Sequence, residues 1–153
     1  MSPAQTTNSL TDENQIRDLV ARYADAVTRR DEKAWAETWT EDGEWQVMGR
    51  TASGREAVVE LWKSLMGGLS FVVQLANTER ISIEGDRGSG RWYVTEYAKS
   101  SDGTALLNVG FYRDEYVRID GVWRFARRRF DALYIGPPDL SGATFTHPEE
   151  VSS

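Results

Sequence analysis

Apolar residues recur at helical spacing between residues 16 and 27. The recurring positions are Ile16, Leu19, Val20, Tyr23, Ala24 and Val27. Such a stripe predicts one buried face of a long amphipathic helix. Thr11 is followed by two acidic residues, which suits an N-cap and a first turn that favours carboxylates. We therefore expect the helix to begin at Thr11, after a flexible lead at residues 1–10.

The pattern then predicts two shorter helices with a strand between them. The first covers residues 31–39, with Trp35 and Trp39 on one face. A strand at 44–48 and a loop at 49–54 precede a third helix at 55–66, which Gly67-Gly68 ends.

Four long strands follow, at about 70–84, 90–99, 105–119 and 122–134. Asp120-Gly121 between the last two is the dipeptide that a tight hairpin favours, because both residues need positive φ. Helices followed by a run of long antiparallel strands predict an α+β fold. In it, a cone-shaped curved sheet wraps around three N-terminal helices and encloses a pocket.

Composition narrows the classes of function. The net charge of −6 argues against a nucleic-acid partner, and Arg127-Arg128-Arg129 alternates between strand faces rather than forming one patch. With no cysteine and one histidine, a metal site, a cysteine nucleophile or a Ser-His-Asp triad is not expected, and we expect no cofactor. No long apolar run or signal pattern is present, so we expect neither membrane binding nor export, but a cytoplasmic protein.

The last segment, residues 136–153, is a polar tail after Pro137-Pro138. We expect it to cover the pocket or a neighbouring subunit, or to stay loose, with His147 solvated.

Several short motifs, taken in order, resemble the nuclear-transport-factor-2-like superfamily and its SnoaL-like branch. They are Ile-Arg-Asp-Leu-Val-Ala-Arg-Tyr at 16–23, Asp31, Trp-Thr-Glu-Asp-Gly at 39–43, Gly-Arg-Glu-Ala at 54–57, Ile-Glu-Gly-Asp at 83–86 and Asp-Gly-Val-Trp-Arg at 120–124. The resemblance covers residues 11–135 and implies a single SnoaL-like domain. Its scaffold hosts dehydratases, isomerases, polyketide cyclases, dehalogenating lyases and binders that do no chemistry, so the fold alone does not fix the function.

The branch includes scytalone dehydratase, bile-acid dehydratase and hexachlorocyclohexane dehydrochlorinase. These enzymes use an Asp-His dyad, so the resemblance implies two matching positions in this chain. Counting from the motifs, the Asp position holds Thr28 and the His position holds Gln74. The dyad is therefore absent, and Gln74 cannot act as a base because an amide does not titrate. We expect both residues to contact substrate instead, Thr28 at the pocket rim.

The resemblance also implies which strand faces line the pocket. Strand parity groups Trp92 with Glu96, and Asn108 with Tyr112, and it groups Ala126 with Arg128 and Phe130. The implied catalytic residues are Tyr23, Glu96 and Arg128. The implied substrate-binding residues are Thr28, Trp45, Gln74, Trp92, Asn108, Tyr112 and Phe130.

Each of these residues also has a structural interpretation. Glu96 in an apolar cavity has a raised pKa and can serve as an acid or base, or it forms an internal ion pair with Arg128. Tyr23 can donate to a substrate oxygen, or it simply belongs to the helix stripe. Arg128 can stabilise an enolate, or it only pairs with Glu96.

The sequence favours a cofactor-independent lyase or isomerase, of elimination, dehydration or retro-aldol type, on a small apolar, aromatic or polycyclic substrate, as in the catabolism of aromatic compounds. The missing dyad favours a ligand-binding module without catalysis. A third alternative is an accessory subunit resembling the β subunit of ring-hydroxylating dioxygenases. Tyr93 and Tyr97 point to the outer sheet face, where aromatic residues are usually covered, so we expect a homodimer or homotrimer.

Overall fold

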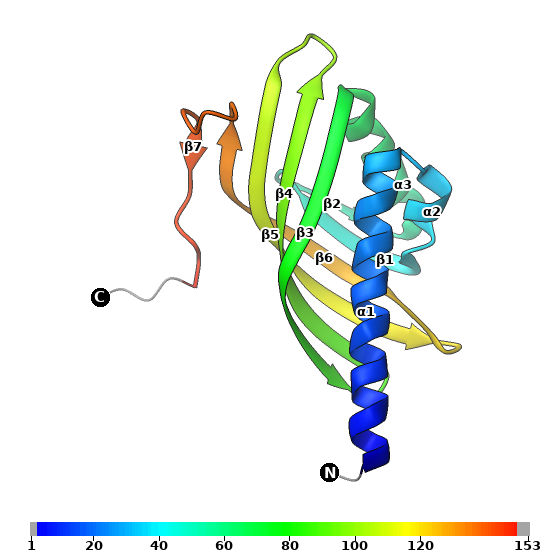
Figure 1. Ribbon diagram of the computed structural model, residues 1–153. Helices are drawn as coiled ribbons and strands as arrows, with labels where there is room; N and C mark the ends of the chain where they lie inside the picture. Colours follow the sequence, from blue (N-terminus) through cyan, green and yellow to red (C-terminus); the bar gives the residue numbers. More distant parts are fainter. Residues whose placement is uncertain (1–2, 150–153) are drawn as a thin grey trace.

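The computed structural model describes residues 3–149, with side chains from Thr11 onward (Figure 1). The helices are α1 (Pro3–Arg29), α2 (Glu32–Ala36) and α3 (Arg55–Gly67). The strands are β1 (Trp39–Val47), β2 (Arg50–Ser53), β3 (Leu69–Glu84), β4 (Arg87–Ser100), β5 (Ala105–Ile119), β6 (Val122–Gly136) and β7 (Ala143–Thr144). The predicted α+β fold, with a curved sheet and three N-terminal helices, is confirmed.

Helix α1 begins earlier than the sequence pattern predicted. It starts at Pro3, so the expected lead is helical from residue 3, and residues 1–2 lie outside the described residues. Proline suits a first helical turn, and no glycine interrupts the segment that follows it. The predicted N-cap at Thr11 is therefore wrong. The apolar stripe is confirmed, since Ile16, Leu19 and Val20 are fully buried.

The second helix is shorter than predicted, because Trp39 begins a strand. Asp31 caps it, and its carboxylate accepts a hydrogen bond from the Ala34 N–H at 3.1 Å. Strand β1 therefore runs from Trp39 rather than from Glu44, and the expected loop at 49–54 contains β2. Trp35 therefore lies on α2 and Trp39 on β1, and both side chains are fully buried.

The strands form one seven-stranded sheet in the order β2-β1-β6-β5-β4-β3, with β7 paired to β6. The sheet is mixed rather than wholly antiparallel, because β1 runs parallel to β6. No hairpin joins these two strands, so their direction is free of the constraint that a tight turn imposes. Helix α1 packs across the concave side of the sheet (Figure 1). The aromatic core lies between them.

The hairpin predicted at Asp120-Gly121 is confirmed, with φ of 52° and 78° at the two residues. Two register shifts follow in β6, opposite Glu115/Tyr116 and Val109/Gly110. Each shift is a β-bulge that changes which residues face inward. As a result, both Phe125 and Arg128 are buried, although strict alternation would place them on opposite faces.

As far as residue 149, the tail does not cover the pocket. After Gly136 it turns back and pairs with β6 through Ala143–Thr144. It then crosses the outer face of the sheet, where His147 contacts Tyr93 and Phe111. His147 was expected to be solvated, but its ring stacks on Phe111 with centroids 4.5 Å apart. Stacking of the His147 imidazole on the Phe111 ring explains why this side chain is not fully solvated. Residues 150–153 lie outside the described residues.

None of the helices in the described part of the chain has the length and apolar character that a membrane crossing requires.

Candidate functional site

A cavity of about 200 Å³ opens between α1, α3 and the concave face of the sheet. Most of its wall is apolar or aromatic. It is lined by Tyr23, Val27, Trp45, Val47, Met48, Trp62, Leu65, Met66, Leu69, Gln74, Val94, Glu96, Ala98, Leu106, Asn108, Tyr112, Phe130 and Ile135. The cavity therefore brings together side chains from six elements that the sequence predicted to line it, namely Tyr23, Trp45, Gln74, Glu96, Asn108, Tyr112 and Phe130.

Three polar residues of the cavity lie in one cross-strand row. Gln74 on β3 is opposite Glu96 on β4, which is opposite Asn108 on β5. Directly opposed residues share one sheet face, so register alone places this row in the cavity. Gln74 Nε2 donates to Glu96 Oε2 at 2.9 Å.

Burial raises the pKa of Glu96, and the hydrogen bond from Gln74 offsets only part of that rise. The other carboxylate oxygen, Oε1, makes no hydrogen bond to the described residues, and the Glu96 side chain lines the cavity. A carboxylate in this setting is a stronger base than one in water, because an apolar surrounding disfavours its charge.

Two other polar atoms in the wall have no partner among the described residues. The indole N–H of Trp45 and the Oδ1 of Asn108 are both buried without a hydrogen bond. A buried polar group without a partner is costly, so the cavity wall holds one unpaired donor and one unpaired acceptor.

Tyr23 and Tyr112 form a hydrogen-bonded pair, with their hydroxyl oxygens 3.3 Å apart. Both side chains are buried, and burial raises the pKa of each phenol. They therefore stay protonated at neutral pH and can donate hydrogen bonds but cannot act as bases.

Arg128 lies behind the two phenols rather than in the cavity. Its guanidinium Cζ is 4.4 Å from the Tyr23 ring centroid and 3.8 Å from that of Tyr112. Its Nε donates to Asp114 Oδ1 at 2.7 Å and its Nη2 to Oδ2 at 3.1 Å. Burial alone would lower the pKa of Arg128, but the Asp114 carboxylate outweighs that effect and keeps the group charged.

The expected Glu96–Arg128 ion pair is therefore wrong. The bulge opposite Glu115/Tyr116 shifts the register by one residue, so that Arg128 faces Asp114 directly. Asp114 also accepts from the Tyr116 hydroxyl at 2.8 Å, which in turn accepts from Trp92 Nε1 at 3.0 Å. Trp92 and Arg128 thus belong to a buried network behind the wall and do not line the cavity, contrary to the prediction.

Thr28 is also absent from the lining. Its hydroxyl accepts a hydrogen bond from the Gln74 backbone N–H at 3.0 Å, which ties α1 to β3. The two positions that the resemblance assigned to a catalytic pair do lie side by side. The pair they form here is structural, because neither side chain titrates.

Sequence reasoning missed Asp114 and Trp62. A signal existed for each: Asp114 alternates with Tyr112 and Tyr116 on one strand face, and Trp62 lies one helical turn from Val58 and Met66. No group of three or more residues that could ligate a metal occurs in the described part of the chain.

The chain has an α+β architecture, in which helices close a curved sheet over a small, mainly apolar pocket. The SnoaL-like domain family model matches residues 8–129, and the chain belongs to this family.

Known relatives include lyases. The gamma-hexachlorocyclohexane dehydrochlorinase of Sphingobium indicum is 28% identical over 137 residues, which cover 87% of this chain and 86% of the relative. A solved type 2 hexachlorocyclohexane dehydrochlorinase superposes with a TM-score of 0.82 at 25% identity, covering 95% of this chain and 99% of the other. A type 3 enzyme from Novosphingobium barchaimii gives a TM-score of 0.81 at 26% identity, covering 94% and 99%. The family thus contains lyases that share this fold over almost the whole chain.

Proposed function

We propose that the protein is a cofactor-independent lyase or isomerase in which Glu96 is the general base. The observation that carries this proposal is the half-buried Glu96 carboxylate, held by Gln74 through one oxygen inside an aromatic-lined cavity. The resemblance places the ordinary base at Gln74. The proposed base, Glu96, instead lies on the neighbouring strand β4, directly opposite Gln74.

In an elimination, Glu96 Oε1 takes the proton from a carbon next to the one that carries the leaving group. The C–H electron pair forms the C=C bond, and the leaving group departs with its own bonding pair. The hydroxyl of Tyr23 or Tyr112 and the indole N–H of Trp45 donate to the leaving group or to a developing enolate oxygen. The dehydrochlorinases among the relatives, whose names describe loss of hydrogen chloride, support this class of reaction.

The size of the cavity favours a small substrate. At about 200 Å³ it is below the roughly 300–1,000 Å³ typical of sites for drug-sized ligands. We therefore infer a substrate with a single ring, such as a halogenated cyclohexane or a hydroxylated cyclic ketone, rather than a polycyclic one.

The test is turnover of a panel of such compounds by Glu96→Gln. Loss of a general base is expected to lower the rate by about 10²–10⁴-fold. Glu84→Gln removes an exposed carboxylate of the same sheet and serves as the control. Full activity of Glu96→Gln on a substrate that the wild type turns over would reject the assignment.

The pH dependence gives a second measurement. A base acts only when ionised, so kcat/KM is expected to fall with decreasing pH through a pKa above the ordinary carboxyl range, because burial raises the pKa of Glu96.

A ligand-binding module is the second candidate. It is favoured by the structural Thr28–Gln74 contact at the expected dyad positions. Recovery of a bound cyclic ligand, chemically unchanged after long incubation with wild-type protein, would favour binding over catalysis.

A further inference from the structure

Four arginines lie in a single row across the outer face of the sheet. Arg80 on β3 is opposite Arg91 on β4, which is opposite Arg113 on β5, which is opposite Arg129 on β6. Like charges directly opposite on one sheet face repel each other and destabilise the pairing. A row of four therefore needs negative charge above it.

The row lies in an open groove of about 820 Å³, which also curves around the β3 edge towards α1. Arg17 in this groove is already paired with Glu13 and Glu79. Asp114 is paired with Arg128 on the other side of the sheet. The remaining arginines are Arg80, Arg91, Arg113, Arg127 and Arg129, and the carboxylates near them are Glu44, Glu115, Asp131 and Glu149.

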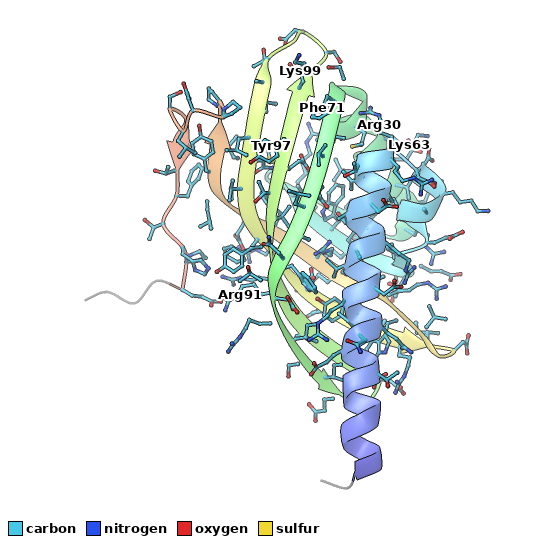
Figure 2. The ribbon with its side chains drawn as sticks, in the orientation of Figure 1. Arg30, Lys63, Phe71, Arg91, Tyr97 and Lys99 are labelled. Carbon is cyan, nitrogen blue, oxygen red and sulfur yellow. The ribbon has the colours of Figure 1, made fainter. Side chains whose placement is uncertain are left out.

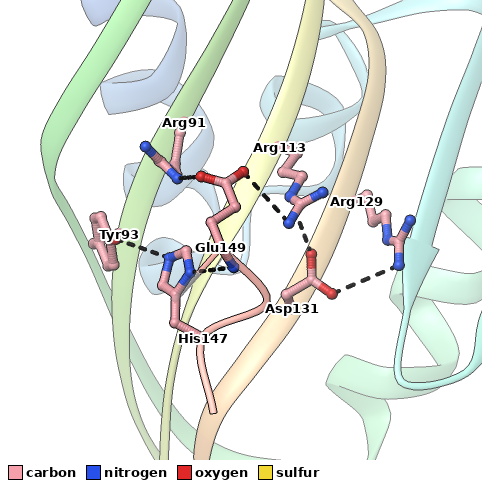
Figure 3. Close-up of polar contacts among 7 residues, drawn as sticks. All are labelled: Arg91, Tyr93, Arg113, Arg129, Asp131, His147 and Glu149. Carbon is pink, nitrogen blue, oxygen red and sulfur yellow. Dashed lines mark hydrogen bonds and ion pairs between the residues drawn. The ribbon is translucent and has the colours of Figure 1, made fainter. Parts of the chain in front are cut away.

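The chain's own tail supplies one of these carboxylates (Figure 3). Glu149 pairs with Arg91, and its Oε1 is also 3.6 Å from Arg113 Nη2, so that one carboxylate bridges two members of the row. His147 holds this segment in place. Its Nε2 is 3.1 Å from the Tyr93 hydroxyl, and its Nδ1 accepts from the Glu149 N–H at 3.1 Å.

The carboxylates present do not satisfy the row. Within residues 11–149, Arg80 has no ion-pair partner, and the Nε groups of Arg91 and Arg113 make no hydrogen bond. Asp131 is 3.6 Å from Arg113 and 3.8 Å from Arg129, which is longer than a hydrogen bond. Glu149 itself stays exposed, with 52% of its side chain accessible to solvent.

We propose that this arginine row is a binding site for a small multivalent anion of the phosphate or polycarboxylate class, and that Glu149 occupies the site in its absence. Planar guanidinium groups side by side suit such anions, because each can donate two parallel hydrogen bonds. The ligand displaces Glu149 and reaches Arg80 and Arg129 as well, which the single carboxylate of the tail does not.

The site is independent of the proposed chemistry. Its arginines are on the outer face, whereas Glu96 and the cavity are on the concave face, so binding can be measured without any turnover.

Calorimetric titration of the full chain at low salt, with pyrophosphate and with citrate as probes, tests the proposal. Glu149→Gln removes the competing carboxylate and is expected to bind the preferred probe about tenfold more tightly than wild type. Arg113→Gln is expected to lose binding, and Arg113→Lys to weaken it, because an ammonium keeps the charge but not the fork. Arg22→Gln, which alters an exposed arginine of α1, is the matched control.

The single histidine gives an independent readout. His147 is the only histidine of the chain, so its imidazole resonances are resolved without assignment. Displacement of Glu149 is expected to shift them in wild type. Tighter binding of one probe identifies phosphate or carboxylate as the preferred class. Equal affinity of wild type and Glu149→Gln for both probes, or an unchanged His147 signal at saturation, would overturn the proposal.

Discussion

Glu96 is a residue whose proposed role conflicts with stability. Burial raises its pKa in the folded protein, so the folded state favours the neutral acid. Glu96 therefore contributes favourably to the free energy of unfolding below its pKa in the unfolded chain. This contribution is lost as the pH rises through its raised pKa in the folded protein. A residue that lowers stability at neutral pH is expected where activity, rather than stability, requires it.

We therefore expect Glu96→Gln to be more stable than wild type at neutral pH, with the difference vanishing in acid. Glutamine is neutral at every pH and keeps a hydrogen-bonding oxygen for Gln74. Urea unfolding at neutral and acid pH measures the effect, and Glu84→Gln is expected to show no such trend. A destabilised Glu96→Gln at neutral pH would show that the carboxylate is structural.

Asp114 presents the opposite case, because its charge is fully buried and paired. Asp114→Asn leaves Arg128 buried without a counter-charge and is expected to cost about 3–5 kcal/mol of unfolding free energy. Asp18→Asn breaks an exposed pair on α1 and is expected to cost less than about 1 kcal/mol. Comparable losses in the two variants, measured by chemical denaturation, would contradict this account.

At the level of elements, the bulges of β6 determine which residues meet. Gly110 on β5 faces the second bulge, and a Cβ there would lie 2.3 Å from the Asp131 carbonyl oxygen and 2.6 Å from Phe130 Cζ. A side chain at this position would force the backbone of β6 to shift. It would also displace the Phe130 ring, which forms part of the cavity wall.

Gly110→Ala is therefore expected to destabilise the protein by about 1–3 kcal/mol and to weaken binding of any cavity ligand. Gly67→Ala adds a methyl group at a helical position with open space around it, and is expected to be neutral or slightly stabilising. Thermal unfolding of both variants makes the comparison. Wild-type stability of Gly110→Ala would mean that the bulge relaxes freely.

The sequence predicted elements better than it predicted partners. The stripe from Ile16 to Val27 and the Asp120-Gly121 turn are local patterns, and both are confirmed. Strand parity, with the cavity side taken from the resemblance, correctly placed Glu96 and Asn108 in the cavity, because no bulge interrupts β4 against β5. It failed for the partner of Arg128, since a bulge depends on packing that only the assembled sheet defines.

At the level of the whole molecule, the upper outer face of the sheet carries exposed apolar side chains next to Lys99, which lies opposite Phe71. Phe71, Leu75 and Tyr97 are about half exposed, at 53%, 51% and 46%. Figure 2 labels Phe71 and Tyr97 on this part of the sheet. The arginine row lies farther along the same face, where Figure 2 labels Arg91. The two regions thus divide the face into an apolar part and a charged part.

We expect a second copy of the chain to cover the apolar part, as the sequence prediction of a homo-oligomer requires. Phe71→Ser combined with Leu75→Ser is expected to shift the protein towards monomer in sedimentation velocity, because apolar area is lost from the contact. Leu140→Ser, which changes an exposed leucine of the tail, should leave the assembly unchanged. A wild-type protein that is monomeric at every concentration would contradict the expectation.

The packing of the tryptophans has an optical consequence. Trp35 and Trp62 stack with centroids 4.9 Å apart and planes 15° from parallel, and Trp45 is 5.3 Å from Trp35. Indoles so close share their electronic excitation, so the protein should show a strong coupled band in near-ultraviolet circular dichroism. Because Trp45 and Trp62 also line the cavity, a molecule that enters it perturbs that band directly, and the chain thereby reports its own occupancy without any label.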